Sequence, residues 1–462
     1  MGMTQLRQLR LFGTSQKTIP IAIDCEHPMV RLADVLEWDI LIEIAEKRRE
    51  KVIISAAGAK PHLRANVGAV VVRAMKSCDL RSTEDLIRNY LPARYLCDLH
   101  ESDWTPDFRT LSDFEIMLGE EGLNEVNIHV LQKAKEQGFA DVKGLCSDTT
   151  AQEAKIPHPT EVGLMNSLAK STEKAMEVLG RKAGFLKRKI LDKIVTIKKL
   201  VRKYRLLAKT KEVKQEVTKT LLKLTKGLSE KIGAVLSGME GKVLMSLRGH
   251  QKTAHDRLKR LRDIFQKLSP QIAYYLRTGR VAKDKIISLF QTEVRSIVRG
   301  KAGKKVEFGL KWGVNQIRGG YISLFRMEGK NSEMDYAVEG VRHHIKLFGR
   351  VPDEYGYDRG GWSKTHIKDI EDLGVKRVAI APKGKAKWKV SNRCRGRMVA
   401  ERAQVEGKIG TTKHYGLNKP ETKTTEGMYR SARRAELRFN LTRYLKDMFP
   451  EVKKAQMVGA TG

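Results

Sequence analysis

The chain has 462 residues, of which 41% are hydrophobic and 31% are charged. This apolar content is sufficient for folded cores, so the composition excludes a chain that is disordered throughout. Lysine and arginine outnumber aspartate and glutamate by 89 to 54, which gives a formal net charge of +35. Such a charge predicts an acidic macromolecule as the partner, with nucleic acid favoured over an anionic membrane surface.

The positive charge is concentrated in the last two thirds of the chain. Residues 1–160 carry a net charge of −4, whereas residues 161–300 carry +22 and residues 301–462 carry +17. We therefore expect the middle and the C-terminal third to supply the cations that contact nucleic acid.

Several classes of protein are excluded because their signals are missing. No stretch approaches the ~20 apolar residues of a membrane span, and residues 1–13 lack the apolar core of a signal peptide. Leu6 stands where a myristoylation motif has serine or threonine. The five cysteines form no C-x-x-C pair and predict scattered thiols in a reducing cytosol. We expect a cytoplasmic protein without a membrane partner.

Residues 25–140 are predicted to be mainly helical. Apolar residues recur at helical spacing between Leu32 and Ile44, and amphipathic segments cover residues 66–76 and 83–90. Ser112 precedes Glu115 at the spacing of a helix-capping box. We predict a helical N-terminal domain over residues 1–140, which is either a plain bundle or a domain for DNA binding and dimerisation.

Residues 161–300 predict a basic, all-helical segment. Its one proline is Pro270, and an apolar stripe runs through Ile190, Ile194, Ile197 and Val201. Polar separators near residues 209–212, 227–229 and 249–252 predict several helices instead of one rod. The segment is either a solvated basic bundle or a DNA-binding arm, and its charge favours the arm.

The hydrophobic period changes from helical to alternating after residue 305. Apolar residues alternate with polar residues or glycine from Val306 to Val314 and predict a strand, and residues 321–326 predict its hairpin partner. A short strand over residues 143–148 is expected to end at Asp148. The elements predicted after the hairpin are a helix over 332–348, a strand over 353–358, a helix over 362–373, a strand over 375–381, and helices over 393–413 and 429–448.

This order of elements predicts an α/β RNase H-like core, a mixed sheet flanked by helices. The core is expected to comprise residues 141–160 and 301–415, with the basic helices inserted after its first strand. Residues 416–462 are expected to form a closing helix and a tail.

Three carboxylates occupy positions suited to metal-dependent chemistry. Asp148 and Asp358 end two predicted core strands, and Glu406 lies in the last core helix. Converging carboxylates repel one another and need a compensating cation, and oxygen ligands suit Mg²⁺ or Mn²⁺. Two such ions ~3.5–4 Å apart can activate water or a 3′-hydroxyl for attack on a phosphodiester.

The surroundings of Glu406 resemble a known signature. Arg402, Glu406 and Lys413 reproduce R-(3)-E-(6)-K, which resembles the motif around the final glutamate of DDE transposases from bacterial insertion sequences. At about 100° per residue the three lie within about 40° of one another on a helix face. The motif's tyrosine, three residues before the arginine, is replaced here by Val399. The competing Glu401 lies off this face.

Further segments extend the resemblance over most of the chain outside the basic insertion. Residues 147–161 and 351–363 are similar to the first and second aspartate motifs of these enzymes. Residues 27–38 and 105–114 resemble their helical N-terminal domain, and residues 438–445 resemble their closing helix. The closest similarity is to the subgroups whose helical block interrupts the core after the first aspartate.

The resemblance implies a transposase that binds the terminal inverted repeats of its element in double-stranded DNA. It would cleave at the ends and join the freed 3′-hydroxyls to target DNA, on DNA in the cytoplasm of a bacterium or archaeon. Asp148, Asp358 and Glu406 would hold two Mg²⁺, with Mn²⁺ able to substitute, while Arg402 and Lys413 contact phosphate. A homodimer is the smallest assembly that pairs two ends.

Two other interpretations remain open. A non-catalytic or architectural DNA-binding protein would use the basic helices alone, and a membrane-surface protein is the least favoured because aromatic anchors are missing. A basic run around Trp388 is either a solvated loop or a DNA contact, and its position before the Glu406 helix favours DNA. The DNA-binding residues predicted in this run are Lys385, Lys387, Arg393 and Arg395.

Overall fold

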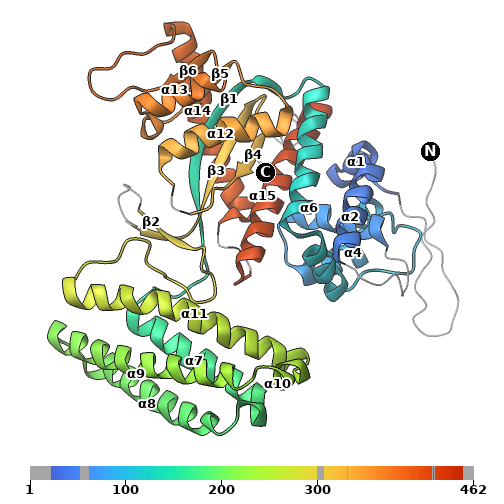
Figure 1. Cartoon of the computed structure of the whole chain (residues 1–462). Coiled ribbons are helices and arrows are strands. Elements are labelled where there is room, and N and C mark those ends of the chain that lie inside the picture. The colour runs from blue at the N-terminus through green and yellow to red at the C-terminus, as the bar shows by residue number, and fades with distance from the viewer. Residues whose placement is uncertain are drawn as a thin grey trace, which may run out of the picture. The chain divides into compact units, whose positions relative to one another are not determined.

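The computed structural model describes residues 22–52, 62–298, 306–329, 331–418, 420 and 422–450 (Figure 1). The chain divides into two compact units, the first made of residues 1–153 and 311–462 and the second of residues 154–310. Residues 1–13, whose sequence argues against a targeting signal, lie outside the described ranges. Among the residues described, every helix is too short or too polar to cross a membrane.

The N-terminal part of the first unit is helical, as the sequence predicts. Its helices are α1 (Pro28–Val35), α2 (Trp38–Val52), α3 (Leu63–Lys76), α4 (Leu80–Asn89), α5 (Leu91–Leu96) and α6 (Phe108–Glu136). The helical spacing between Leu32 and Ile44 covers two helices, because the backbone at Leu36 is extended. The capping role predicted for Ser112 is wrong, since Asp107 caps α6 by accepting a hydrogen bond from the backbone of Thr110 at 2.7 Å.

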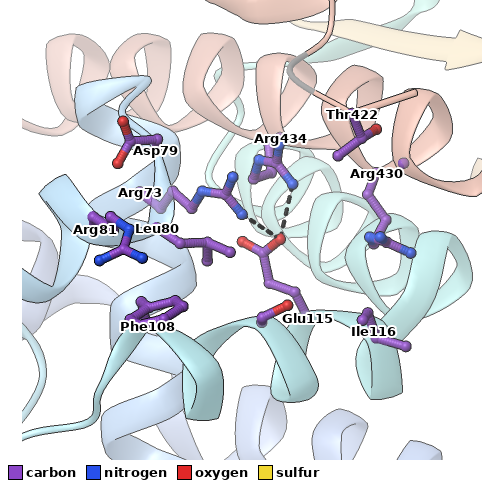
Figure 2. Close-up of a pocket in the computed structure, with 12 residues that line it drawn as sticks. Arg73, Asp79, Leu80, Arg81, Phe108, Glu115, Ile116, Thr422, Arg430 and Arg434 are labelled. Carbon is purple, nitrogen blue, oxygen red and sulfur yellow. Dashed lines mark hydrogen bonds and ion pairs between the residues drawn. The ribbon is translucent and has the colours of Figure 1, made fainter. Parts of the chain in front are cut away.

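The C-terminal helix α15 (Thr425–Met448) joins these N-terminal helices through a buried ion-pair group. Glu115 of α6 contacts Arg73 of α3 at 2.5 Å and Arg434 of α15 at 2.9 Å (Figure 2). Only 6% of the Glu115 side chain is exposed. Removing an arginine or the glutamate would leave a buried charge with less compensation, which is unfavourable. The ion pairs therefore stabilise the packing of α3, α6 and α15 against one another.

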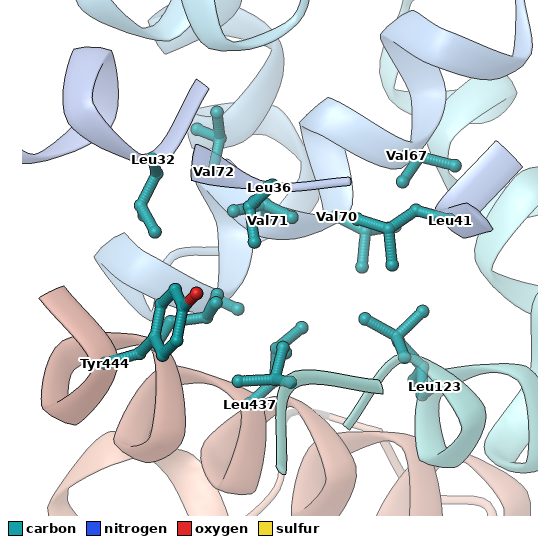
Figure 3. Packing of buried hydrophobic residues seen from close by; sticks show 14 of the residues in the cluster. Leu32, Leu36, Leu41, Val67, Val70, Val71, Val72, Leu123, Leu437 and Tyr444 are labelled. Carbon is teal, nitrogen blue, oxygen red and sulfur yellow. The ribbon is translucent and has the colours of Figure 1, made fainter. Parts of the chain in front are cut away.

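The same elements share one apolar core. Leu32 of α1, Val71 of α3, Leu123 of α6 and Leu437 of α15 are almost fully buried in a single cluster (Figure 3). The cluster continues to Ile317, a residue of the central sheet. The N-terminal helices therefore bury their apolar faces against α15 and the sheet instead of forming a core of their own.

A mixed, open sheet forms the centre of the first unit. Its strands are β1 (Asp141–Glu153), β3 (Val306–Arg318), β4 (Ile322–Phe325), β5 (Glu354–Tyr357) and β6 (Arg377–Ile380), in the order β4-β3-β1-β5-β6. β5 is parallel to β1 and β6, and β4 is antiparallel to β3. Ser147 bonds Asn315 while Gln152 bonds Trp312, so residue numbers rise on β1 as they fall on β3, and these two strands are antiparallel.

Strand β1 is longer than the predicted strand over residues 143–148. Residues 150–152 in its second half are buried, and the Gln152 side chain accepts a hydrogen bond from Trp312 at 2.9 Å and donates one to the Met428 carbonyl at 2.8 Å. These buried bonds extend the strand, because they satisfy polar groups that a turn would leave unpaired. Asp148 thus lies within β1 and not at its end.

Helices cover both faces of the sheet. Gly340 of α12 (Glu333–Phe348) lies against Ser147, whereas Met398 of α14 (Asn392–Thr412) lies against Cys146. Neighbouring residues of a strand point to opposite faces, so α12 and α14 pack on opposite sides. A Cβ atom at Gly340 would lie 2.9 Å from Ser147 Oγ, which explains why glycine allows this close approach. Helix α13 (Lys364–Asp372) connects β5 to β6.

The second unit is mainly a bundle of basic helices with a core of its own. Helices α7 (Glu161–Leu179), α8 (Leu186–Leu207), α9 (Lys211–Ser237) and α11 (Gly249–Thr278) pack against one another. The predicted stripe of α8 is confirmed, since Ile190, Ile194 and Ile197 are fully buried. The break predicted near residues 227–229 is wrong, because the buried Leu228 keeps α9 helical through its packing. The short strand β2 (Arg295–Val298), which pairs with the first residues of β3, escaped the sequence analysis.

Candidate active site

Two of the three predicted carboxylates lie near each other, Asp148 within β1 and Asp358 directly after β5. Cys146 of β1 is in register with Gly356 of β5, and Asp148 and Asp358 each follow these residues by two positions. The parallel pairing ends at Cys146 and Gly356, so both acids lie just beyond it, and the charge of Asp358 acts on Asp148. The sequence prediction that these two acids converge agrees with this register.

The surroundings of Asp148 disfavour its charge. Burial raises the pKa of Asp148 to about 6, and the nearby charges of Asp358 and Glu333 act in the same direction. The backbone N–H of Thr149 donates to Asp148 Oδ1 at 2.6 Å, and together with the Arg402 guanidinium it lowers the pKa, but by less. Asp148 therefore lies in a pair of carboxylates that the protein's own cations do not fully neutralise.

Asp358 is held by the turn that follows β5. Its side chain accepts a hydrogen bond from the backbone N–H of Gly360 and caps the short 3₁₀ helix η2 (Arg359–Gly361). A Cβ atom at Gly360 would lie 2.7 Å from Asp358 Oδ1. Glycine at this position therefore leaves room for the carboxylate at the end of β5.

Helix α14 carries Arg402 and Glu406, the first two residues of the R-(3)-E-(6)-K motif. It runs without interruption through Gly407 and Gly410, because Cys394, Met398 and Val405 are buried against the sheet. Lys413 directly follows α14, at the start of the π-helical turn η3 (Lys413–Leu417). The continuous helix places Lys413 ~10 Å beyond Glu406 along the axis, at 1.5 Å per residue.

Arg402 and Glu406 have different surroundings in the structure. Arg402 is half-buried, and its charge lowers the pKa of Asp148. Glu406 lies one helical turn further along α14, exposed, and makes no hydrogen bond or ion pair with the residues described. The charges of Asp358 and Arg402 thus act on Asp148, whereas the structure does not place Glu406 in contact with these residues.

The competing Glu401 has a different role. It pairs with Arg318 of β3 at 2.7 Å, and Arg318 in turn pairs with the buried Glu354 at 2.6 Å. Arg377 and Arg397 also pair with Glu354. Glu401 therefore belongs to an ion-pair network at the start of β5, and it is not a candidate for the third acid.

Glu333 is a fourth carboxylate that sequence reasoning missed. It stands at the start of α12 and accepts hydrogen bonds from Thr149 Oγ1 at 2.9 Å and from the Tyr357 hydroxyl at 2.9 Å. Burial raises the pKa of Glu333, but its ion pair with Lys311 at 2.7 Å and these hydrogen bonds outweigh burial and lower it. An acid in the first turn of a helix is common, so the sequence carried no signal for this contact.

The aspartate pair suits a divalent metal in its chemistry but is not a complete site by itself. Its donors are carboxylate oxygens, the ligands that Mg²⁺ prefers. Within the described ranges, no group of three or more histidine, cysteine, aspartate or glutamate side chains is close enough together to hold a metal ion. Asp148 and Asp358 are therefore the residues that fit a metal, and a third acid would have to approach them.

The four DNA-binding residues predicted in the run around Trp388 lie in an exposed loop and in the first turn of α14. All four side chains are exposed, and Arg395 lies over the Trp388 ring at 5.8 Å. The neighbouring cations Lys389 and Arg397 are instead paired with Glu371 and Glu354. The side chains open to an anionic partner are Lys385, Lys387, Arg393 and Arg395.

The second unit has a basic tip at one end of its bundle, formed by residues 180–189 and 242–252. The Lys182 ammonium donates to Ser246 Oγ at 2.8 Å, which joins the two segments. Phe185 is 80% exposed and Met245 is 75% exposed, so the tip also presents apolar side chains. Neither segment contains an acidic residue, and the cations are Arg181, Lys182, Lys187, Arg188, Lys189, Lys242, Arg248 and Lys252.

Comparisons of the chain with protein-family models, curated proteins and solved structures give no match.

Proposed function

We propose that the chain is a DDE-type DNA transposase with an RNase H-like catalytic core. The observation that carries the proposal is the position of Asp148 and Asp358 just beyond the parallel pairing of β1 with β5, where the charges of Asp358 and Arg402 both act on Asp148. Two neighbouring carboxylates and a guanidinium provide what phosphodiester chemistry needs, namely oxygen ligands for a cation and a partner for phosphate.

The sheet supports an RNase H-like core through its strand order. A hairpin, β3 and β4, lies on one side of β1, and two parallel strands, β5 and β6, lie on the other. Helix α12 precedes β5, α13 connects β5 to β6, and α14 follows β6. This is the order of elements that the sequence analysis expects for such a core, with the basic bundle following β1.

In the proposed reaction, Asp148 and Asp358 would hold Mg²⁺ or Mn²⁺ and Glu406 would complete the site by approaching the pair. The bound metal would supply Lewis-acid activation of a water or a 3′-hydroxyl and would stabilise the leaving oxygen. Arg402 would neutralise a phosphate next to the pair, and Lys413 would contact the backbone further along α14. A carboxyl must be ionised to bind a cation, so the raised pKa of Asp148 weakens metal binding below about pH 6.

Lysines and arginines away from the aspartate pair would hold the DNA. The exposed loop around Trp388 and the basic tip both present lysines and arginines that form no cluster with acids. The proposed partners of the protein are the terminal inverted repeats and the target DNA. A homodimer would hold the two transposon ends together. The proposed location is on DNA in the cytoplasm of a bacterium or archaeon.

A non-catalytic DNA-binding protein is the second candidate. The specific observation in its favour is the exposed position of Glu406, together with the lack of a three-acid cluster among the residues described. In that case the basic surfaces would bind DNA without cleavage.

The deciding experiment is a cleavage assay with Mg²⁺ on duplex DNA that carries the inverted repeats flanking the coding sequence. We expect end cleavage by the wild type and a loss of at least about 1,000-fold in Asp358→Asn, because the oxygen donors for the metal are reduced. Asp372→Asn is the matched control, since Asp372 is exposed at the end of α13. Binding without cleavage in Mg²⁺ or Mn²⁺, or full cleavage by Asp358→Asn, would overturn the proposal.

A further inference from the structure

A cavity lined by arginines lies between the N-terminal helices and α15, away from the aspartate pair. Its volume is about 340 Å³, at the lower end of the ~300–1,000 Å³ typical of small-molecule sites. Four guanidinium groups line it, from Arg73, Arg81, Arg430 and Arg434, and we call it the arginine pocket (Figure 2). Leu80, Phe108 and Ile116 provide apolar walls.

Arginines outnumber acids among the described residues that line the pocket. Arg73 and Arg434 both contact the same atom of Glu115, Oε2, at 2.5 and 2.9 Å. The second acid, Asp79, lies at the rim and accepts a hydrogen bond from the backbone N–H of Ser82 at 2.8 Å as the cap of α4. Among the described residues that line the pocket, four guanidinium groups thus stand against two carboxylates.

Two of the arginines form no ion pair with an acid in the described part of the chain. Arg430 makes no hydrogen bond or ion pair with any residue in the described part of the chain, although its charge acts on Glu115. Arg81 lies over the Phe108 ring at 4.2 Å and forms no ion pair with the described residues. Both side chains are therefore placed to bind an anion that enters the cavity.

We propose that the arginine pocket binds a phosphate group of a nucleotide or of nucleic acid. A guanidinium presents paired N–H donors that match the oxygens of phosphate, and several of them around one cavity bind a doubly charged anion better than a single carboxylate. The volume exceeds that of a phosphate alone, and the apolar walls would contact an attached sugar or base. The inference does not depend on the proposed transposase activity, because no residue of the aspartate pair takes part.

The test measures binding of full-length protein in EDTA to three probes: inorganic phosphate, adenosine monophosphate and a 12-base-pair duplex. We expect phosphate and adenosine monophosphate to raise the melting temperature, since a ligand of the folded state stabilises it. Arg430→Gln should weaken their binding at least about tenfold, because a charge-assisted hydrogen bond is lost. Arg109→Gln, an exposed change on α6 outside the cavity, should stay within about twofold of the wild type.

The probes also separate the two sources of phosphate. Competition of the duplex with adenosine monophosphate for the wild type, absent in Arg430→Gln, would assign the pocket to nucleic acid, whereas independent binding would assign it to a free nucleotide. Wild-type affinity of both Arg430→Gln and Arg81→Gln for all three probes would overturn the inference. Asp358→Asn should bind phosphate normally, so loss of cleavage and loss of phosphate binding report on different proposals.

Discussion

At the scale of single residues, His344 couples the stability of the first unit to pH. Its ring is 1% exposed, and Nε2–H donates to the Val142 carbonyl at 2.9 Å. Burial lowers the pKa of His344 from 6.5 to about 4, against the opposing effect of this carbonyl. The unfolded chain therefore takes up a proton first as the pH falls, and stability declines between pH 6.5 and about 4.

The prediction uses His344→Gln, which keeps an N–H donor and removes the titration. At about 1.4 kcal/mol per pKa unit, the wild type should lose on the order of 3 kcal/mol more than the variant between pH 7 and pH 4. Urea unfolding at several pH values measures the difference, and the other acids and His343 are common to both proteins. Parallel curves for the two proteins over this range would contradict the prediction.

The candidate site shows which residue contacts follow from sequence. Asp148 and Asp358 could be paired because strand periodicity and order determine which residues become neighbours in a sheet. The helical spacing of Arg402 to Glu406 places both on α14, but it does not bring Glu406 into contact with the aspartates. The Glu333 contacts could not be predicted, because they depend on how α12 approaches β1, and the sequence shows an ordinary first-turn acid.

At the scale of elements, α15 protects the edge strand β4. The Asn440 side chain accepts a hydrogen bond from the Ile322 N–H at 3.1 Å and donates one to the Ile322 carbonyl at 2.9 Å. Glu436 accepts from the Leu324 N–H at 2.9 Å, and Arg433 donates to its carbonyl at 2.7 Å. Side chains of a helix thus replace the missing neighbouring strand and keep the edge from pairing with another chain.

We expect Asn440→Ala to destabilise the protein by on the order of 3 kcal/mol. The asparagine is fully buried, so its removal leaves a backbone donor and a backbone acceptor unpaired. Thr442→Ala, two residues along α15, is the control and should cost less than about 1 kcal/mol. Denaturant unfolding gives both values, and equal costs would show that α15 contributes packing alone at this edge.

Element types were predictable from periodicity, whereas their ends were decided by tertiary contacts. The predicted helix over residues 332–348 agrees with α12, since Ser332 forms a capping box with Asp335 that is readable in the sequence. β1 runs beyond its predicted end because Gln152 finds partners on β3 and α15. α9 continues past Gly227 because its buried face outweighs local helix propensity.

At the scale of the whole molecule, the division into units and the distribution of charge agree. The compact unit that begins at Ala154 contains most of the segment with a net charge of +22, while the acid-balanced first 160 residues largely belong to the other unit. The predicted insertion over residues 161–300 was shorter than this unit, because the sequence could not show that the first residues of β3 pair with β2.

This separation predicts which cations control the salt dependence of DNA binding. Each phosphate contact contributes about 0.9 to the slope of log affinity against log salt. Replacing Arg181, Arg188, Lys242 and Lys252 of the basic tip with glutamine should reduce the slope by up to about 3.6, because all four are exposed and have no acidic partner among the described residues.

The matched variant replaces four cations of the acid-balanced part, Arg49, Lys51, Arg109 and Lys143, and changes the net charge of the chain equally. If overall charge alone attracted DNA, both variants would lose affinity alike. If the placement of charge matters, the second variant should change the slope by less than about 1. Fluorescence-anisotropy titrations from 50 to 300 mM salt distinguish the two cases, and a larger effect of the second variant would assign the DNA contact to the N-terminal helices instead.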